Sequence, residues 1–127
     1  MKQRKEVDEI LRDLLKKDPR YKHGAYEFVS AGLAYTVHKT GATRHVSGKE
    51  LCQGLREFAI EQFGLMARPV LQSWRIGRTE DFGEIVFNLI GVGLFGKSDA
   101  DSRDDFAGVY DFDEAFGDLK IDLGGEE

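Results

Sequence analysis

The sequence lacks the features of secreted and membrane proteins. Its one cysteine cannot form a disulfide within the chain, which fits a reducing compartment. The first eight residues, MKQRKEVD, are highly charged and no apolar run follows them, which excludes a secretory signal. No window approaches the length of about 18 uncharged apolar residues that a membrane span needs, so we expect no membrane partner. These absences predict a cytoplasmic protein.

The composition is that of an ordinary folded domain. The 127 residues are 41% hydrophobic and 32% charged, which is typical of globular rather than disordered chains. Nine Phe, four Tyr and one Trp supply large core side chains, so stability requires no disulfide, metal ion or other cofactor. With no repeat and no linker, the sequence predicts a single helical domain at 1–118 and a frayed acidic tail at 119–127.

Apolar residues at helical spacing predict two helices in the first third of the chain. One is expected at 2–17 and ends before Pro19, because the residue before a proline avoids the α region. The other is expected at 24–39, with Gly41 as its C-terminal stop.

Capping signals predict two further helices. Ser47 and Glu50 match the S-x-x-E capping box, in which each side chain accepts a backbone hydrogen bond at the start of a helix. This helix is expected to end at about Phe63, before Gly64. Pro69 suits the first turn of a short helix that follows.

The fifth helical pattern, at 80–93, has Thr79 as its expected N-cap and acidic residues in its first turn. The alternative is a buried strand at 85–90, since short apolar runs suit either structure. The rest of the chain is expected to be irregular, with a short hairpin pairing 94–95 with 109–110 as one option.

Together these patterns predict a mainly α fold, a compact bundle of four or five helices with a short irregular or hairpin-containing acidic C-terminal segment. The expected core residues are Leu14, Phe28, Val29, Leu33, Leu51, Leu55, Phe58, Trp74, Phe82, Ile85, Val86 and Leu89.

The charge of the chain changes sign after Arg78. Up to that residue there are 15 Lys and Arg against 9 Asp and Glu, and beyond it 3 against 14, so +6 and −11 give the net −5. Either the acidic half packs on the basic half, or the two halves face different partners.

Two motifs resemble ligand sites but lack the required context. The segment 91–98 matches the phosphate-binding pattern G-x-x-x-x-G-K-S, yet it follows a predicted helix and precedes an acidic cluster that would repel phosphate. A helix end and a turn are favoured there. The segment 99–105 begins like a calcium loop but has Arg103 at a ligand position and Asp104 where glycine is required, which favours a solvated turn.

Candidate catalytic side chains have simpler explanations. Cys52 lies on the apolar face of its predicted helix, where a thiol is inert, and His45 is not expected to activate it. The scattered histidines have no metal-ligand spacing, so no zinc site is predicted. Glu57 and Glu61 share one face of a helix, where a solvated surface is the favoured interpretation. We therefore predict no catalytic, cofactor or metal-binding residue.

A set of basic residues around one tryptophan is the best candidate for a binding surface, because arginine pairs with phosphate and tryptophan stacks on bases. Its members are Arg44, Lys49, Arg56, Arg68, Trp74, Arg75 and Arg78. The surrounding helices suit a winged-helix domain that binds nucleic acid. The acidic pI of about 5.2 argues against this, and several of these arginines are candidates for pairing with the acidic half.

Several segments together resemble a small bacterial family of uncharacterised proteins. They are YEFV at 26–29, RHVSGKEL at 44–51, QFGLMA at 62–67, EDFGEIVFNL at 80–89, DF at 105–106 and VYDF at 109–112. The resemblance covers about residues 21–116 and implies a compact, mainly helical bacterial protein, with no activity and no catalytic residues to assign.

The expected function is a non-catalytic interaction or regulatory module whose partner is a protein. The alternative is a nucleic-acid-binding winged-helix-like domain that uses the basic half, and a second alternative is a small enzyme. A steep salt dependence of nucleic-acid binding would distinguish the first alternative.

Overall fold

The computed structural model describes residues 4–41, 45–96 and 102–117. These residues form helices and connecting turns, and none of them lies in a strand. The α-helices are α1 (Arg4–Lys17), α2 (His23–Thr40), α3 (Gly48–Phe63), α4 (Ala67–Ser73), α5 (Thr79–Gly91) and α6 (Phe112–Phe116), and the 3-10 turns are η1 (Gly64–Met66) and η2 (Arg103–Phe106). The predicted mainly α fold is confirmed, with α1 to α5 as its main body.

The helix ends lie where the sequence signals predicted them. The Ser47 hydroxyl accepts from the amide N–H of Glu50 at 3.1 Å, and the Glu50 carboxylate accepts from the amide of Ser47 at 2.9 Å. This is the predicted capping box of α3. The glycines that follow α2 and α3 have positive φ angles, 66° at Gly41 and 53° at Gly64. Glycine adopts these angles without steric cost, so both helices end there.

Three expectations near α5 differ in detail. Thr79 is the first helical residue rather than the cap, and the Asp81 carboxylate instead accepts from the amides of Gly77 and Arg78, at 2.8 and 3.2 Å. The alternative of a buried strand at 85–90 is wrong, because those residues are helical. The optional hairpin does not form either: 94–95 and 109–110 lie in irregular backbone. The expected tail at 119–127 lies outside the described residues.

The helices α2 and α3 cross at very short range because each has a glycine at the contact. A Cβ atom built on Gly32 would lie 2.2 Å from Leu55 Cδ2, and one built on Gly54 would lie 1.8 Å from Thr36 Oγ1. The Thr36 hydroxyl is buried and donates to the carbonyl of Gly32 at 2.7 Å, so this polar group has a hydrogen-bond partner inside the contact.

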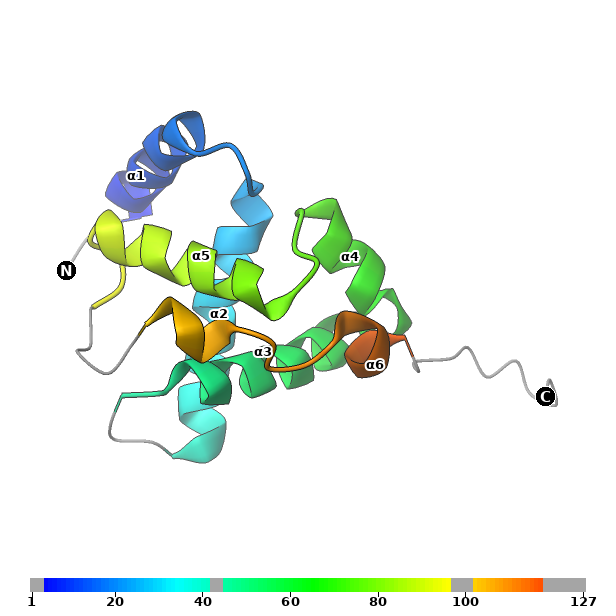
Figure 1. Cartoon of the computed structure of the whole chain (residues 1–127). Helices are drawn as coiled ribbons and strands as arrows, with labels where there is room; N and C mark the ends of the chain where they lie inside the picture. The colour runs from blue at the N-terminus through cyan, green and yellow to red at the C-terminus, as the bar shows by residue number, and fades with distance from the viewer. Residues whose placement is uncertain (1–3, 42–44, 97–101, 118–127) are drawn as a thin grey trace, which may run out of the picture.

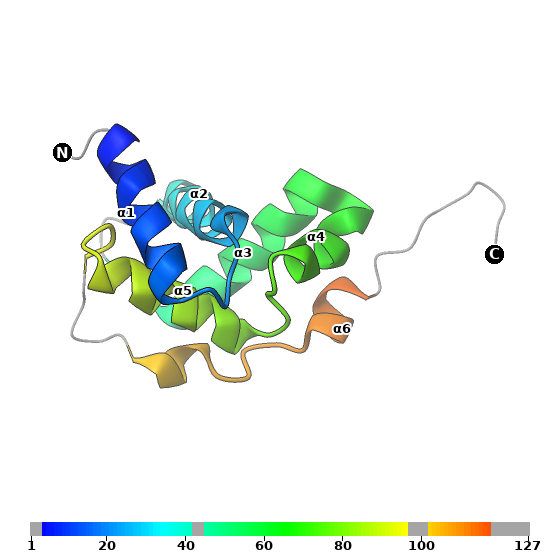
Figure 2. The ribbon, with the colours of Figure 1, turned by 90° about the horizontal axis from the view of Figure 1, so that it is seen from above.

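Helices α2, α3 and α5 enclose the main core, with α1 packed on one end and α4 at the other (Figures 1 and 2). Of the twelve predicted core residues, nine are buried, namely Leu14, Phe28, Val29, Leu51, Leu55, Phe82, Ile85, Val86 and Leu89. The other three, Leu33, Phe58 and Trp74, are half-buried and pack against this core. No described helix has both the length and the apolar character that a bilayer crossing requires.

The C-terminal segment (residues 102–117) runs along one side of the bundle (Figures 1 and 2). It passes α5 and the start of α3 with η2, and it ends with α6 beside α4. Phe106, Phe112 and Phe116 are buried in it, although the segment is acidic and has no helical period. It is therefore an integral part of the fold.

Candidate functional site

The predicted basic surface is divided in the structure, and two of its arginines bind the C-terminal segment. Arg56 Nε donates to the carbonyl oxygen of Ala115 at 3.2 Å, and Arg68 forms an ion pair with Asp113. Arg44 lies outside the described residues. Lys49 and Arg78 have exposed side chains on α3 and before α5.

The other two members of that set contact the body of the protein. The Trp74 ring packs against Phe28 and Phe63, with centroids 5.7 and 5.9 Å away, so part of its surface is used in contacts within the protein. Arg75 has a φ of 72°, in the left-handed region, and its guanidinium donates to the carbonyl of Pro19 at 3.4 Å. Four of the six described members of the set thus serve internal contacts.

The segment 91–98, which matches the phosphate-binding pattern, begins at the end of α5, as the favoured interpretation predicted. Gly91 is the last residue of that helix, and Gly93 turns the chain with a φ of 81°. Its lysine and serine, at 97 and 98, lie outside the described residues, as do 99–101 of the calcium-like segment. The part that follows, from Ser102, enters the 3-10 turn η2.

The environments of Cys52, Glu57 and Glu61 are those of a buried core thiol and of surface carboxylates. Burial, with a smaller effect of the Glu80 charge, raises the pKa of Cys52 to about 12, so its thiol stays protonated. The Glu57 carboxylate pairs with Lys39 of α2, and Glu61 is exposed. Among the described residues, no three His, Cys, Asp or Glu side chains are grouped so that they could hold a metal ion.

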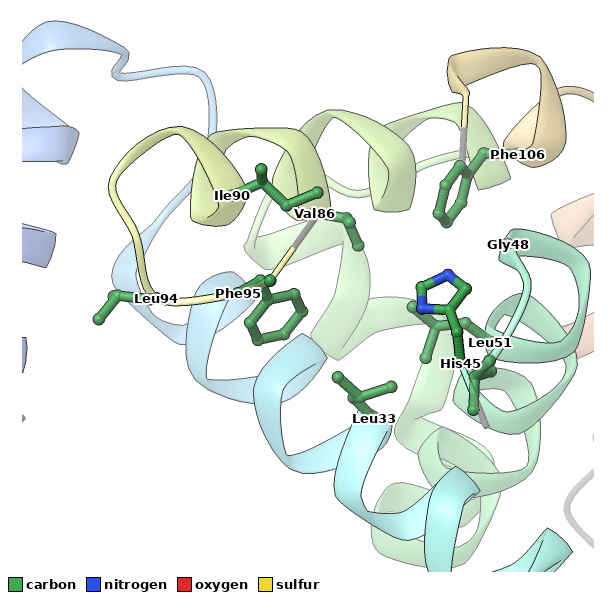
Figure 3. A pocket seen from close by; sticks show the side chains of 11 residues that line it. Leu33, His45, Gly48, Leu51, Val86, Ile90, Leu94, Phe95 and Phe106 are labelled. Atoms are coloured by element: carbon green, nitrogen blue, oxygen red, sulfur yellow. The ribbon is translucent and has the colours of Figure 1, made fainter. Parts of the chain in front are cut away.

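A cavity of about 640 Å³ lies between α2, α3 and α5, and no pattern in the sequence indicates it. Figure 3 shows Val86 and Ile90 of α5 on one side of it and Leu33 of α2 on the opposite side. The described residues that line it are Leu33, His45, Val46, Gly48, Leu51, Val86, Ile90, Leu94, Phe95, Gly96 and Phe106. Its volume is within the range of about 300–1,000 Å³ that is usual for ligand pockets.

The lining is almost wholly apolar. Among the described residues of the lining, only His45 has an ionisable side chain, and it projects toward the centre of the pocket (Figure 3). The arrangement suits the binding of apolar groups.

Titratable groups with shifted pKa values lie away from the pocket. The hydrogen bond from Arg20 holds the pKa of Asp18 well below its usual range. Burial, helped by a hydrogen bond of 2.6 Å to Asp81, raises the pKa of Tyr21, and burial raises that of Tyr110. These shifts arise in structural contacts, so they do not mark a catalytic site.

Phe106 forms the wall of the pocket that comes from the C-terminal segment. Its ring and backbone pack against two glycines: a Cβ on Gly48 would lie 3.0 Å from Phe106 Cε1, and one on Gly83 would lie 2.9 Å from Phe106 Cβ. Glycine within a helix is otherwise unfavourable, so Gly48 and Gly83 were a usable sign of close packing. Their partner, 20 or more residues away, could not be identified from the sequence.

The chain matches no protein-family model, no curated protein and no solved structure. The resemblance to a bacterial family therefore stays a prediction, and the function must be argued from the geometry of the pocket.

Proposed function

We propose that this protein is a non-catalytic interaction module, acting in a bacterial cytoplasm, whose pocket receives apolar side chains of a partner protein. The observation that carries the proposal is the pocket itself, about 640 Å³ in volume, whose described lining is apolar except for His45. Burial of one Leu or Phe side chain contributes about 1.5–3 kcal/mol. Two such anchors would offset part of the cost of association.

The edge of the pocket favours a protein rather than a fully enclosed small molecule. Leu33, Ile90, Leu94 and Phe95 line it and are each half-buried, so they offer apolar surface both inside the pocket and at its mouth. A protein surface can cover such a mouth while its side chains fill the interior, as binding energy in interfaces concentrates in anchors seated in pockets.

The surroundings of the basic residues support this choice over nucleic acid. Arg56 and Arg68 already bind the C-terminal segment, and Trp74 packs against two phenylalanines. The lone Cys52 is buried and unreactive, which is compatible with the cytoplasm.

Filling the pocket tests the proposal. Leu33→Trp adds a large side chain to the lining, and Ile60→Trp is the matched control, because Ile60 is also half-buried but lies outside the pocket. Each tagged variant is used to capture proteins from bacterial extract, and any protein retained by wild type is then purified and titrated against all three.

We expect a partner whose Kd rises at least about tenfold with Leu33→Trp, which is a loss of about 1.4 kcal/mol, and changes little with Ile60→Trp. A partner that binds all three proteins equally would refute the pocket as the site. Recovery of nucleic acid with a steep salt dependence would favour the alternative function instead.

A further inference from the structure

Phe106 belongs both to the pocket and to the C-terminal segment, and the two halves of that segment are held unequally. In the first half (102–109) the only buried side chain is that of Phe106. Its ring meets Phe87 edge-on, with centroids 6.3 Å apart. Val109 is half-buried and packs against the core, and Arg103 lies 4.8 Å from the centre of the Phe87 ring. The other contacts of this half are hydrogen bonds and the ion pair of Arg103 with Glu84.

Those polar contacts all end on α5. Thr79 Oγ1 donates to the carbonyl oxygen of Phe106 at 2.6 Å and accepts from the amide of Val109 at 3.2 Å. The amide of Gly108 donates to Glu80 Oε2 at 3.0 Å. Hydrogen bonds of this kind contribute about 0.5–1.5 kcal/mol each.

The second half (110–117) is held by a cluster of aromatic rings. Phe112 packs against Phe82 and Phe116, with centroids 5.8 and 5.0 Å away, and Phe116 is also buried. The Tyr110 hydroxyl donates to the carbonyl oxygen of Cys52 at 2.7 Å. With several buried rings against one, this half resists opening more strongly than the first half does.

Gly108 lies at the junction of the two halves and has a φ of 57°. Glycine accepts such a conformation and its alternatives with little cost, so the backbone can pivot there without disturbing the aromatic cluster. Opening of 102–109 would withdraw Phe106 from between Gly48 and Gly83 and remove one wall of the pocket.

We propose that Phe106 is a movable wall, so that occupation of the pocket and docking of residues 102–109 on α5 favour each other. The inference rests on the proposed function and adds a form of regulation to the same site. An apolar group in the pocket contacts Phe106 only while 102–109 is docked, so it binds the docked state better. Thermodynamic linkage then makes the effect reciprocal. A partner that binds residues 102–109 would likewise change the affinity of the pocket for apolar groups.

Hydrogen exchange measured by NMR tests this coupling with an uncharged apolar dye, N-phenyl-1-naphthylamine, as the probe. The reporters are the amides of Gly108 and Val109, which donate to α5 side chains and exchange when 102–109 opens. The internal control is the amide of Ala115, which donates to the carbonyl of Asp111 at 2.8 Å in the second half.

With the probe at ten times its Kd, exchange at both reporters should slow by about 11-fold, because the probe binds only while 102–109 is docked. Without the probe, both reporters should be less protected than Ala115, because 102–109 opens while the second half stays docked. Leu33→Trp should abolish both probe binding and the slowing. Thr79→Val, which removes two hydrogen bonds of 102–109 without touching the pocket lining, should speed exchange at Gly108 in the absence of probe.

The outcomes separate this inference from the proposed function. If the probe binds and Leu33→Trp blocks it, but exchange at Gly108 and Val109 does not slow, the movable wall is refuted and the pocket remains. Equal protection of Gly108, Val109 and Ala115 without the probe also refutes it, because 102–109 would then open only together with the second half. If the probe does not bind, or binds Leu33→Trp equally, both the inference and its premise fail.

Discussion

The crossing of α2 and α3 should fail with the addition of a single methyl group at Gly54. The Cβ of Gly54→Ala would lie 1.8 Å from Thr36 Oγ1 and 2.8 Å from both Cβ and Cγ2 of Thr36. Real Cβ atoms do not approach other heavy atoms within 3.0 Å, so the first contact alone requires a movement of 1.2 Å. Thr36 is buried and hydrogen-bonded to Gly32, so a rotation of its side chain away from the new Cβ would break this hydrogen bond.

The magnitude follows from two opposing effects. Overpacking a core usually costs about 1–3 kcal/mol, and a clash with an immobile side chain on another helix belongs above that range, at about 4 kcal/mol. Alanine in place of glycine gains about 1 kcal/mol of helix propensity. The net loss for Gly54→Ala is therefore about 3 kcal/mol, a large fraction of the roughly 5–15 kcal/mol that stabilises a typical domain.

Urea unfolding followed by circular dichroism measures this loss. Gly91→Ala is the matched control, because Gly91 is also helical and an added Cβ there meets no atom within 4 Å. Thr36→Ala removes the two atoms that branch from Cβ, so Gly54→Ala should cost at least about 1 kcal/mol less in that background.

Two results would refute the argument. One is a Gly54→Ala protein within about 0.5 kcal/mol of Gly91→Ala, which would mean that the helices separate at no cost. The other is the same loss with and without the Thr36 side chain, which would mean that the clash lies elsewhere. Since Leu33 and Leu51 are neighbours of this crossing in α2 and α3 and line the pocket, a separation of the helices should also weaken probe binding.

Three further predictions concern single residues. Arg75 has a φ of 72°, so Arg75→Gly should raise the free energy of unfolding by about 1 kcal/mol in urea titrations, and Gly41→Ala, at a φ of 66°, should lower it by about as much. Because Arg20 lowers the folded pKa of Asp18, the carboxylate stabilises the fold above its unfolded pKa and loses this effect as the pH falls below about 4. Asp18→Asn should flatten the pH dependence of unfolding in that range, and unchanged curves would contradict the pairing. Burial raises the pKa of Cys52 to about 12, so a thiol reagent should modify the folded protein at least about 100-fold more slowly than the urea-unfolded protein.

The positions of the helices could be predicted because their ends are set by local chemistry. Gly41 and Gly64 end helices through their own φ values, and Ser47 with Glu50 begins one through hydrogen bonds within four residues. The error of one residue at Thr79 has a cause that is not local. Its hydroxyl, which would have capped α5, instead donates to the distant carbonyl of Phe106.

The pocket could not be predicted because its walls come from segments with no shared pattern. Leu33, Leu51 and Val86 were correctly assigned to an apolar face, but nothing in their spacing tells a filled core from a hollow one. His45 was considered as a base for a cysteine, whereas the structure places it at a cavity lined otherwise by apolar groups and glycines.

The charge reversal after Arg78 is clear in the sequence, but the ion pairs that it produces contribute little to the stability of the fold. The acidic half does contact the basic half, through Arg20 with Glu84 and through Arg68 with Asp113. These pairs are partly exposed, and such pairs contribute roughly 0–1 kcal/mol each.

Phe106, Phe112 and Phe116 are buried in the same segment, and each contributes about 1.5–3 kcal/mol before entropy is subtracted. The aromatic side chains therefore hold the C-terminal segment in place, while the charges select which surface it meets. It follows that high salt should leave the segment docked, whereas loss of a single phenylalanine ring should release the half that depends on it.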